Sequence, residues 1–561
     1  MKSYLFSAIL SGLCWLTVQF TMAQDERILV PQTGFRSDMN KSAVVRIKPD
    51  SFHVVNLAGK TVLKEKLGQA KPWEFSGETV SIADISSIRD IGDYYLTVPG
   101  TDAKRLFGIY KDPYGEVANA AVKALYFNRC SYPVLPEFGG KWARNAGHPD
   151  NEVYVHKSAV SDGRPEGFVI SSPGGWYDAG DYNKYIVNSS ISVYTMLLAY
   201  EMFPDYWNKR IINIPESSNN LPDILDETLF NLNWMLTMQD KDGGVYHKCT
   251  ELQFSGFVMP ENTHPKRYVV QKNTQATLDF AATMAHASIL LRNFEKELPG
   301  LADNCKNAAI KAWNWCLLNP AILYTQPRDV GTGAYGDRNL SDEWFWAGVE
   351  MNILTGSAFP DSLLSKIKFV TPSWGDVAQL GMITALRNKD KVKPDTYTRC
   401  MNIYMGYADK LVEISEKSGY PISLDFFNWG SNSDVANQGL LKVVAFSLTH
   451  DKNYLRSAIN DMNYLTGVNP TGYCYITGIG VKSPRNIHHR PSGSDNILDP
   501  IPGFLVGGPN TNVWNDCPDA KDRSKLPALS FVDELCSYST NEICINWNTP
   551  LVFLSGALSA E

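Results

Sequence analysis

The spacing of apolar and polar residues changes in character near residue 110. Before it, short apolar runs at 42–47, 52–55 and 93–98 are separated by turn residues rich in Gly, Asn and Pro. Short strands with regular turn signals are typical of a β-sandwich. The pattern therefore predicts a small all-β domain over residues 27–110. This stretch has no paired carboxylates and no His cluster, so a supporting role is expected for it.

From residue 115 the apolar residues recur at helical spacing. Leu225, Leu229, Leu232 and Leu236 follow one another at intervals of four, three and four residues, which is the stripe of an amphipathic helix. The segments 276–291, 308–318 and 344–354 have the same pattern. We therefore predict an all-α domain over 115–561. Long loops rich in Gly, Asp, Asn and aromatic residues join these helices and are candidates for function.

Length and charge restrict the class of protein further. A chain of 561 residues fits two domains, and its 44% hydrophobic content is enough for a large core. The formal net charge of -7, without a dense Lys/Arg run, argues against nucleic acid or anionic membranes as partners.

The first residues have the composition of a secretory signal. Lys2 precedes a mostly apolar stretch over 4–20, and Ala23 ends a small-residue cleavage site. We predict that residues 1–23 are removed and the chain is exported. A membrane anchor is the alternative, but the stretch is short, and no second long apolar run follows, so no transmembrane segment is expected in the mature chain. Nine cysteines then remain, an odd number, so at least one is unpaired within the chain.

The segment 174–182 carries the first candidate chemistry. Asp178 and Asp181 lie three residues apart beside glycines, so a turn places both carboxylates on one side. Two such groups can hold and polarise one water molecule. The alternative is an ordinary turn or helix cap, for which Asp and Gly are also common.

Two later segments add further polar groups. His488 and Arg490 lie in one loop, and Arg offers a rigid fork of donors for hydroxyl groups. A zinc site is not indicated there, because adjacent His residues seldom bind one ion and no HExxH spacing is present. Glu542 precedes the apolar run 547–558, and a carboxyl backed by apolar residues has the raised pKa that a general acid needs. A Glu that complements a helix dipole is the alternative.

Together these motifs resemble glycoside hydrolase family 9, the endoglucanase family with an (α/α)6 barrel. The resemblance covers nearly the whole chain after the signal peptide. The family's first signature fits at Gly480, Lys482, Ile487, His488 and Arg490, and its second at Phe531, Asp533, Tyr538, Glu542, Asn548 and Thr549. The segments 221–227, 238–248, 333–337 and 428–432 also look like the family. Cys544 departs from the usual Ser, Thr or Ala, and the domain over 27–110 resembles the family's immunoglobulin-like module.

The resemblance implies an inverting mechanism. Glu542 is then the general acid, Asp181 the general base and Asp178 a second carboxylate that holds the attacking water, with acid and base roughly 6.5–9.5 Å apart. His488 and Arg490 are implied to bind sugar hydroxyls, and His247 and Tyr538 to line the cleft. Among the tryptophans, candidate stacking platforms are Trp176, Trp344, Trp374 and Trp429, for each of which core packing is the alternative.

The resemblance implies no catalytic cofactor, but it does imply a structural Ca²⁺ near the cleft. The loop with Asp337, Asn339, Asp342 and Glu343 offers hard oxygen ligands, and Asp376 would complete the set. The alternative is a helix that begins at Ser341 with acidic residues in its first turn.

The predicted function is that of a secreted, monomeric endo-β-1,4-glucanase. Its substrate would be a soluble or amorphous β-glucan, whether cellulosic, mixed-linkage or xyloglucan, since the sequence ends soon after Glu542 with no room for a C-terminal carbohydrate-binding module. One alternative is an exo-acting β-glucosidase or glucosaminidase on short oligosaccharides. The other is a non-catalytic glucan-binding protein, which the presence of all three carboxylates disfavours.

Overall fold

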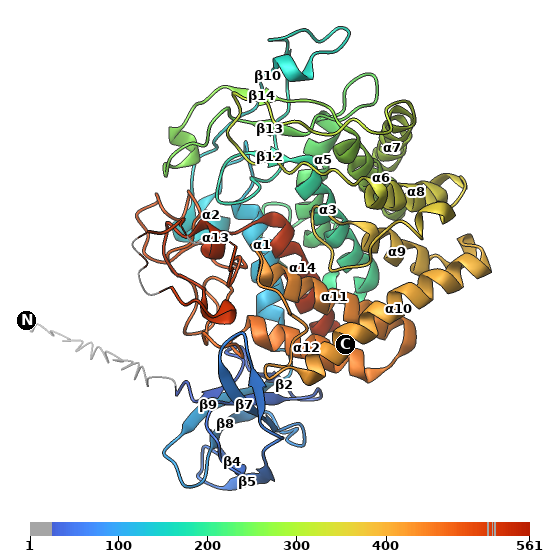
Figure 1. The fold of residues 1–561 in the computed structure, drawn as a ribbon. Helices are drawn as coiled ribbons and strands as arrows, with labels where there is room; N and C mark the ends of the chain where they lie inside the picture. Colours follow the sequence, from blue (N-terminus) through green and yellow to red (C-terminus); the bar gives the residue numbers. More distant parts are fainter. Residues whose placement is uncertain (1–24, 513–514, 519, 521–522) are drawn as a thin grey trace, which may run out of the picture.

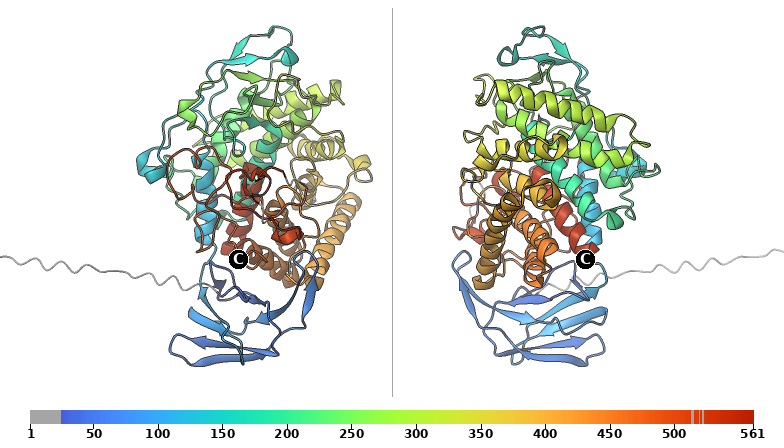
Figure 2. Two further views of the ribbon diagram at one scale, coloured as in Figure 1. Left: turned by 60° about the vertical axis from the view of Figure 1, so that its left-hand side comes forward. Right: turned by 90° about the vertical axis from the view of Figure 1, so that its right-hand side faces the viewer.

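The chain folds into a β-domain and a larger helical domain (Figure 1). The computed structural model describes residues 25–561 except 513–514, 519 and 521–522. The predicted signal peptide, 1–23, lies outside the described residues. In all three views the β-domain lies at one end of the helical domain, and a small sheet of residues 153–270 lies at the other end (Figures 1 and 2).

Two sheets face each other in the N-terminal domain. The first has the order β1-β3-β7-β6 and the second β2-β9-β8-β4-β5. Side chains alternate along the strands: Phe52 and Val54 point into the core, as do Tyr94 and Leu96. The strands are β1 Ile28–Leu29, β2 Phe35–Arg36, β3 Ser42–Val45, β4 Ser51–Asn56, β5 Thr61–Lys66, β6 Lys71–Trp73, β7 Glu78–Asp84, β8 Gly92–Thr97 and β9 Lys104–Tyr110. The three strands expected from apolar runs correspond to β3, β4 and β8.

The β-domain is fixed to the helical domain by specific contacts. The Gln32 side chain donates to the carbonyl oxygen of Gly472 at 2.9 Å and accepts from the backbone N–H of Val481 at 2.8 Å. Trp73 packs against Tyr420 with ring centroids 4.8 Å apart. Buried aromatic area and paired backbone groups both favour a fixed arrangement of the two domains.

The helices of the second domain are of two kinds. Helices α3 and α14 are buried on nearly all sides, which places them in the interior. Helix α10 instead buries a stripe at Cys400, Tyr404, Ala408 and Leu411, spaced by three or four residues, and exposes its other faces. The helices are α1 Gly115–Phe127, α2 Pro136–Gly139, α3 Ile186–Met202, α4 Pro204–Trp207, α5 Asp223–Thr237, α6 Thr274–Leu291, α7 Leu301–Leu318, α8 Ser341–Thr355, α9 Ala378–Arg387, α10 Pro394–Lys417, α11 Ser431–Thr449, α12 Lys452–Leu465, α13 Tyr538–Asn541 and α14 Ile545–Ala560.

A third sheet lies within the segment for which only helices were predicted. Its order is β11-β10-β14-β13-β12. The strands are β10 Val153–Val155, β11 Val169–Ile170, β12 Lys184–Tyr185, β13 Lys248–Thr250 and β14 Arg267–Val269. Runs of two or three residues are too short to produce a strand period in the sequence. The all-α prediction for this segment is therefore corrected to a mainly helical domain with one small sheet. In that sheet, β12 connects the turn that carries Asp181 to α3.

Two further observations concern the described residues. Cys517 and Cys536 form a disulfide, and the other described cysteines are free and buried. Among these residues, no helix combines the length and the apolar character needed to span a bilayer.

Candidate active site

Three segments that are distant in sequence meet at the paired aspartates. Ala179 forms a β-bridge with Cys544, and His488 forms one with Glu542. The backbone N–H of Arg490 donates to the carbonyl oxygen of Gly180 at 3.0 Å. These backbone contacts bring together Asp178, Asp181, Glu542, His488 and Arg490, the five predicted residues with the strongest sequence motifs.

Gly180 makes this close approach possible. A Cβ atom at this position would lie 2.1 Å from the carbonyl oxygen of His488 and 3.1 Å from Glu542 Oε1. A distance of 2.1 Å is well inside van der Waals contact, so any side chain here would push the His488 loop away. The glycine of the aspartate turn is therefore needed to hold Glu542 beside the two aspartates.

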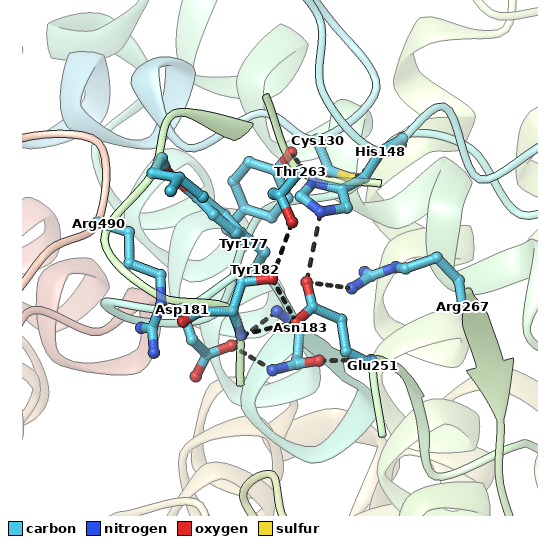
Figure 3. A network of polar contacts seen from close by, with 12 residues as sticks. Cys130, His148, Tyr177, Asp181, Tyr182, Asn183, Glu251, Thr263, Arg267 and Arg490 are labelled. Carbon is cyan, nitrogen blue, oxygen red and sulfur yellow. Dashed lines mark hydrogen bonds and ion pairs between the residues drawn. The ribbon is translucent and has the colours of Figure 1, made fainter. Parts of the chain in front are cut away.

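Asp181 is buried but is supplied with donors. Its Oδ1 accepts from the backbone N–H of Asn183 at 2.6 Å and from Asn183 Nδ2 at 2.7 Å. Burial raises the pKa of Asp181, while the Arg490 charge and the two Asn183 hydrogen bonds oppose that rise. Asn183 is held in turn, since its Oδ1 accepts from the backbone N–H of Glu251 at 2.8 Å. Figure 3 shows this network, which continues through Glu251 to His148 and Arg267.

Asp178 has neutral donors and a negative neighbour. Asn188 Nδ2 donates to its Oδ1 at 2.7 Å, and the Tyr335 hydroxyl donates to its Oδ2 at 3.0 Å. Burial, followed by the charge of Asp181, raises the pKa of Asp178 to about 8. The charge of Asp181 therefore favours the protonated form of Asp178.

Glu542 is the carboxyl that most strongly favours its protonated form. Its side chain is partly buried, and burial followed by the charge of Asp181 raises its pKa well above the usual range. Arg490 opposes this shift without reversing it. A protonated carboxyl beside an ionised one is the arrangement that acid–base catalysis requires.

The polar atoms of Arg490 and His488 make hydrogen bonds with different backbone groups. Arg490 donates from Nε to the carbonyl oxygen of Ser255 at 2.6 Å and from Nη1 to that of Gly180 at 2.7 Å. It therefore anchors two loops as well as supplying charge. His488 Nδ1 pairs with the carbonyl oxygen of Leu535 at 2.8 Å, which assigns the proton to Nδ1. Nε2 is then an acceptor on a neutral ring, because burial lowers the pKa of His488.

The remaining predicted cleft residues divide into exposed and enclosed. Trp429 is 43% exposed, and its ring lies 5.3 Å from that of Tyr538, which in turn lies 5.8 Å from His488. Trp374 is half-buried, 5.1 Å from the ring of Tyr335. These residues form two aromatic groups, one on the Glu542 side and one on the Asp178 side.

The other three predicted residues are held by neighbouring side chains or backbone groups. Trp176 is fully buried, and its Nε1 donates to Glu227 at 2.8 Å, so its interpretation as a stacking platform is wrong. Trp344 packs on Trp313. His247 is also fully buried; its Nε2 pairs with the carbonyl oxygen of Ala334 at 2.7 Å, next to Tyr335.

Several functional candidates were not found from the sequence. Asn183 and Asn188 contact the aspartates, yet nothing in a single sequence separates them from other loop or helix residues. Tyr335 lies in the segment 333–337 that resembles the family, but its contact with Asp178 was not predicted. Phe254 and Phe257 are 45% and 37% exposed, and the Phe257 ring lies 5.2 Å from His488. Their signal was available: two aromatic residues flank Ser and Gly in a loop between β13 and β14.

A second group of acidic residues lies at the N-terminus of α8. Oxygen atoms of Asp337, Asp342 and Glu343 lie within 4.8 Å of one another. Asp279 of α6 faces them, and both its oxygens and both of Glu343 have no hydrogen-bond partner among the described residues. Burial and the neighbouring carboxylates raise the pKa of Asp279 and Glu343 well above the usual range. Enclosed carboxylates with free oxygens fit a hard divalent cation.

The other two predicted ligands differ from each other. Asp376 is close enough for the Asp342 charge, after burial, to raise its pKa to about 7. Asn339 is occupied locally, since its Oδ1 accepts from the Ser341 hydroxyl at 2.8 Å. The structure therefore adds Asp279 to the predicted set and gives Asn339 a role in the turn before α8.

Comparison with known proteins supports the same interpretation. The glycosyl hydrolase family 9 model matches residues 114–555, and the cellulase N-terminal ig-like domain matches 23–103. A xyloglucan-specific endo-β-1,4-glucanase of Bacteroides ovatus is 40% identical over 98% of this chain and 97% of its own length. Endoglucanase D of Acetivibrio thermocellus is 33% identical over 94% and 83%.

Solved structures give the same result. A Bacteroides ovatus family 9 structure superposes with a TM-score of 0.89 at 40% identity, covering 96% of this chain and 99% of its own. A thermostable endoglucanase from Alicyclobacillus acidocaldarius gives 0.86 at 30% identity, covering 95% and 99%. The predicted family and the immunoglobulin-like module are thereby confirmed, and the chain belongs to glycosyl hydrolase family 9.

Proposed function

We propose that this chain is an exported endo-β-1,4-glucanase that hydrolyses β-glucan with inversion at the anomeric carbon. One observation carries the proposal: Glu542, whose pKa is raised well above the usual range, lies in the same site as Asp181, to which Arg490 supplies a positive charge and Asn183 two hydrogen bonds. A protonated acid and an ionised base around one bond are the requirements of glycoside hydrolysis by direct water attack.

The reaction follows from these protonation states. Glu542 donates its proton to the glycosidic oxygen as the bond from that oxygen to the anomeric carbon breaks. A water molecule attacks the same carbon from the opposite face, and Asp181 accepts its proton. Because Asn183 occupies Oδ1 of Asp181 with two hydrogen bonds, Oδ2 is the atom that faces the water. Asp178, held by Asn188 and Tyr335, orients that water from the other side.

The substrate assignment rests on the aromatic groups and on the relatives. Trp374 packs on Tyr335, which bonds Asp178, and Trp429 packs on Tyr538, which lies beside His488. Two aromatic platforms suit a chain that extends beyond a single sugar, which favours endo attack over removal of terminal residues. The named activities of the Bacteroides and Acetivibrio relatives agree with a β-1,4-glucan, and the former favours xyloglucan among the three predicted polymers.

We also propose that the helical domain is an (α/α)6 barrel. Helices α3, α6, α8, α9, α11 and α14 are largely buried. In one direction α3 contacts α6, α6 contacts α8, and α8 contacts α9. In the other direction α3 contacts α14 and α14 contacts α11, and α10 contacts both α9 and α11. An inner ring of six helices with outer helices around it accounts for this order of contacts.

A structural Ca²⁺ is proposed at the acidic group. Asp279, Asp337, Asp342 and Glu343 would hold it, with Asp376 at the edge. Bound there, the cation would neutralise the carboxylates and fix the start of α8 relative to α6. It takes no part in the bond cleavage described above.

Product analysis tests the proposal. The purified chain would be incubated with carboxymethylcellulose, mixed-linkage glucan, xyloglucan and cello-oligosaccharides, with Glu542→Gln as the matched control. We expect mixed oligosaccharides and a rapid fall in viscosity on at least one polymer, and none with the variant. Monosaccharide alone, released steadily from short oligomers, would contradict endo action, and binding without any new reducing ends would contradict the enzyme assignment.

A further inference from the structure

A cavity of about 580 Å³ lies beside the cleft. Its walls come from the loop before α9, the loop before α11 and the helix α10. Ser373 and Asn428 line it, and each immediately precedes one of the two cleft tryptophans, Trp374 and Trp429. Neither tryptophan lines the cavity itself. The cavity therefore borders the segments that carry both cleft tryptophans without including either ring.

The cavity contains polar atoms that lack partners. Gln438 of α11 is 5% exposed, and its Nε2 donates to Thr371 Oγ1 at 3.3 Å. Within the described part of the chain, its Oε1 has no hydrogen-bond partner, and neither has Asn428 Oδ1. A buried amide oxygen without a donor is unfavourable, so these two acceptors indicate a ligand that supplies donors.

Another part of the cavity wall is apolar. Phe426 is 57% exposed and Val370 is 38% exposed, so a flat ring and a branched aliphatic side chain face the opening. Acceptors for hydroxyl groups beside a flat apolar surface are suited to an uncharged sugar ring, which has both hydroxyls and a C–H face. The volume lies within the range of small-molecule sites.

Gly406 keeps one wall of this cavity open. It lies within α10, is exposed, and a Cβ atom added to it would meet nothing within 4 Å. Glycine inside a helix is less stable than alanine, and no close approach explains it here. Its effect is to leave space on the side of α10 that faces Phe426 and Gln438.

We propose that this cavity is a subsite for a sugar branch on the glucan backbone, so that the enzyme acts on a branched β-1,4-glucan. The proposal rests on the endoglucanase function above. A backbone stacked on Trp374 and Trp429 passes the cavity rather than entering it. A substituent on that backbone can reach Gln438 Oε1 and Asn428 Oδ1, donate its hydroxyls to them, and place its C–H face on Phe426.

Blocking the cavity tests the proposal. Gly406→Phe fills the open wall, and Gly406→Ala is the matched control, with no steric cost and a better helix former. Each full-length variant would be assayed on xyloglucan, which is branched, and on cellohexaose, which is not. We expect Gly406→Phe to lower kcat/KM on xyloglucan by about tenfold, mainly through KM, and to leave cellohexaose within about twofold. Gly406→Ala should match the wild type on both.

A second variant keeps the test independent of the blocking side chain. Gln438→Leu removes the free amide oxygen at similar volume and should produce the same selective loss on xyloglucan. Equal losses on both substrates, or no loss on either, would overturn the branch subsite. Failure of the proposed function has a different signature, because the wild type would then cleave neither substrate.

Discussion

Two groups of buried carboxyls in this protein have opposite surroundings. At the catalytic centre, Asp181 and Asp178 receive hydrogen bonds from Asn183, Asn188 and Tyr335. Around the start of α8, Asp279 of α6 and Glu343 of α8 have carboxyl oxygens without donors among the described residues. The first group is stabilised by the protein alone and can exchange protons. The second fits the cation proposed above, which would make it a structural element rather than an acid–base pair.

The largest effect on activity is expected from replacing Glu542, the proposed general acid of the catalytic centre. Glu542→Gln keeps the shape of the side chain but cannot donate a carboxylic proton, so kcat should fall by roughly 10²–10⁴-fold. The melting temperature should stay near that of the wild type, because the neutral amide has the shape of the protonated carboxyl that the raised pKa of Glu542 favours. Initial rates on a soluble β-glucan and a thermal melt would be measured together. A variant with more than a tenth of wild-type activity would contradict the role of Glu542.

Asn183 distinguishes the two aspartates. Asn183→Ala removes one of the hydrogen bonds that hold Asp181 ionised, so its pKa should rise and the acidic limb of the kcat/KM profile should move up by about one pH unit. The control is Asn188→Ala, which removes a donor to Asp178 instead. It should lower kcat without moving that limb. If both variants shift the limb equally, Asp181 is not distinct from Asp178 as the base.

Removal of metal should affect the acidic group around the start of α8. Treatment with a chelator should lower the melting temperature by several degrees, and added Ca²⁺ should restore it, since a ligand bound only to the folded state stabilises it. Asp279→Asn should abolish the response, whereas Asn339→Ala should retain it because Asn339 is bonded to Ser341. A melting temperature that ignores both chelator and Ca²⁺ would remove the proposed site.

The smallest expected effect is the change of stability with pH when the metal has been removed by a chelator. The folded-state pKa of Asp376 is raised to about 7, above its ordinary value of 3.8. A carboxyl with a raised folded-state pKa stabilises the fold fully below its unfolded pKa and loses that contribution as pH rises. Stability should therefore decline by a few degrees of melting temperature between about pH 4 and pH 7 in chelator, and less with Ca²⁺. A rising curve over this interval would have the wrong sign.

The sequence was sufficient for much of the fold and for the central site. Apolar runs located β3, β4 and β8, and periodicity located α5 to α8, because these elements are long enough to repeat their pattern. The catalytic candidates lie in Gly-rich or polar loops with distinctive spacing. The five-stranded sheet was missed because its strands have only two or three residues.

The direction in which a side chain points, and which distant segments meet, could not be predicted from the sequence. Trp176 and Trp429 both follow glycine-rich or polar residues, yet one is fully buried on Glu227 and the other is 43% exposed. Asp279 lies in an apolar helix, and only the packing of α6 against α8 brings it to the acidic loop. The cavity at Gln438 depends on three segments that only the tertiary structure brings together.

The stereochemistry of the first product tests the central claim most directly. Cleavage of a β-1,4-glucan would be followed by proton NMR in the first minutes, before the anomers equilibrate. Glu542 as acid and Asp181 as base for water predict that the new reducing end appears as the α-anomer. Initial release of the β-anomer would mean that a carboxylate attacks the sugar itself, and would contradict this account of the site.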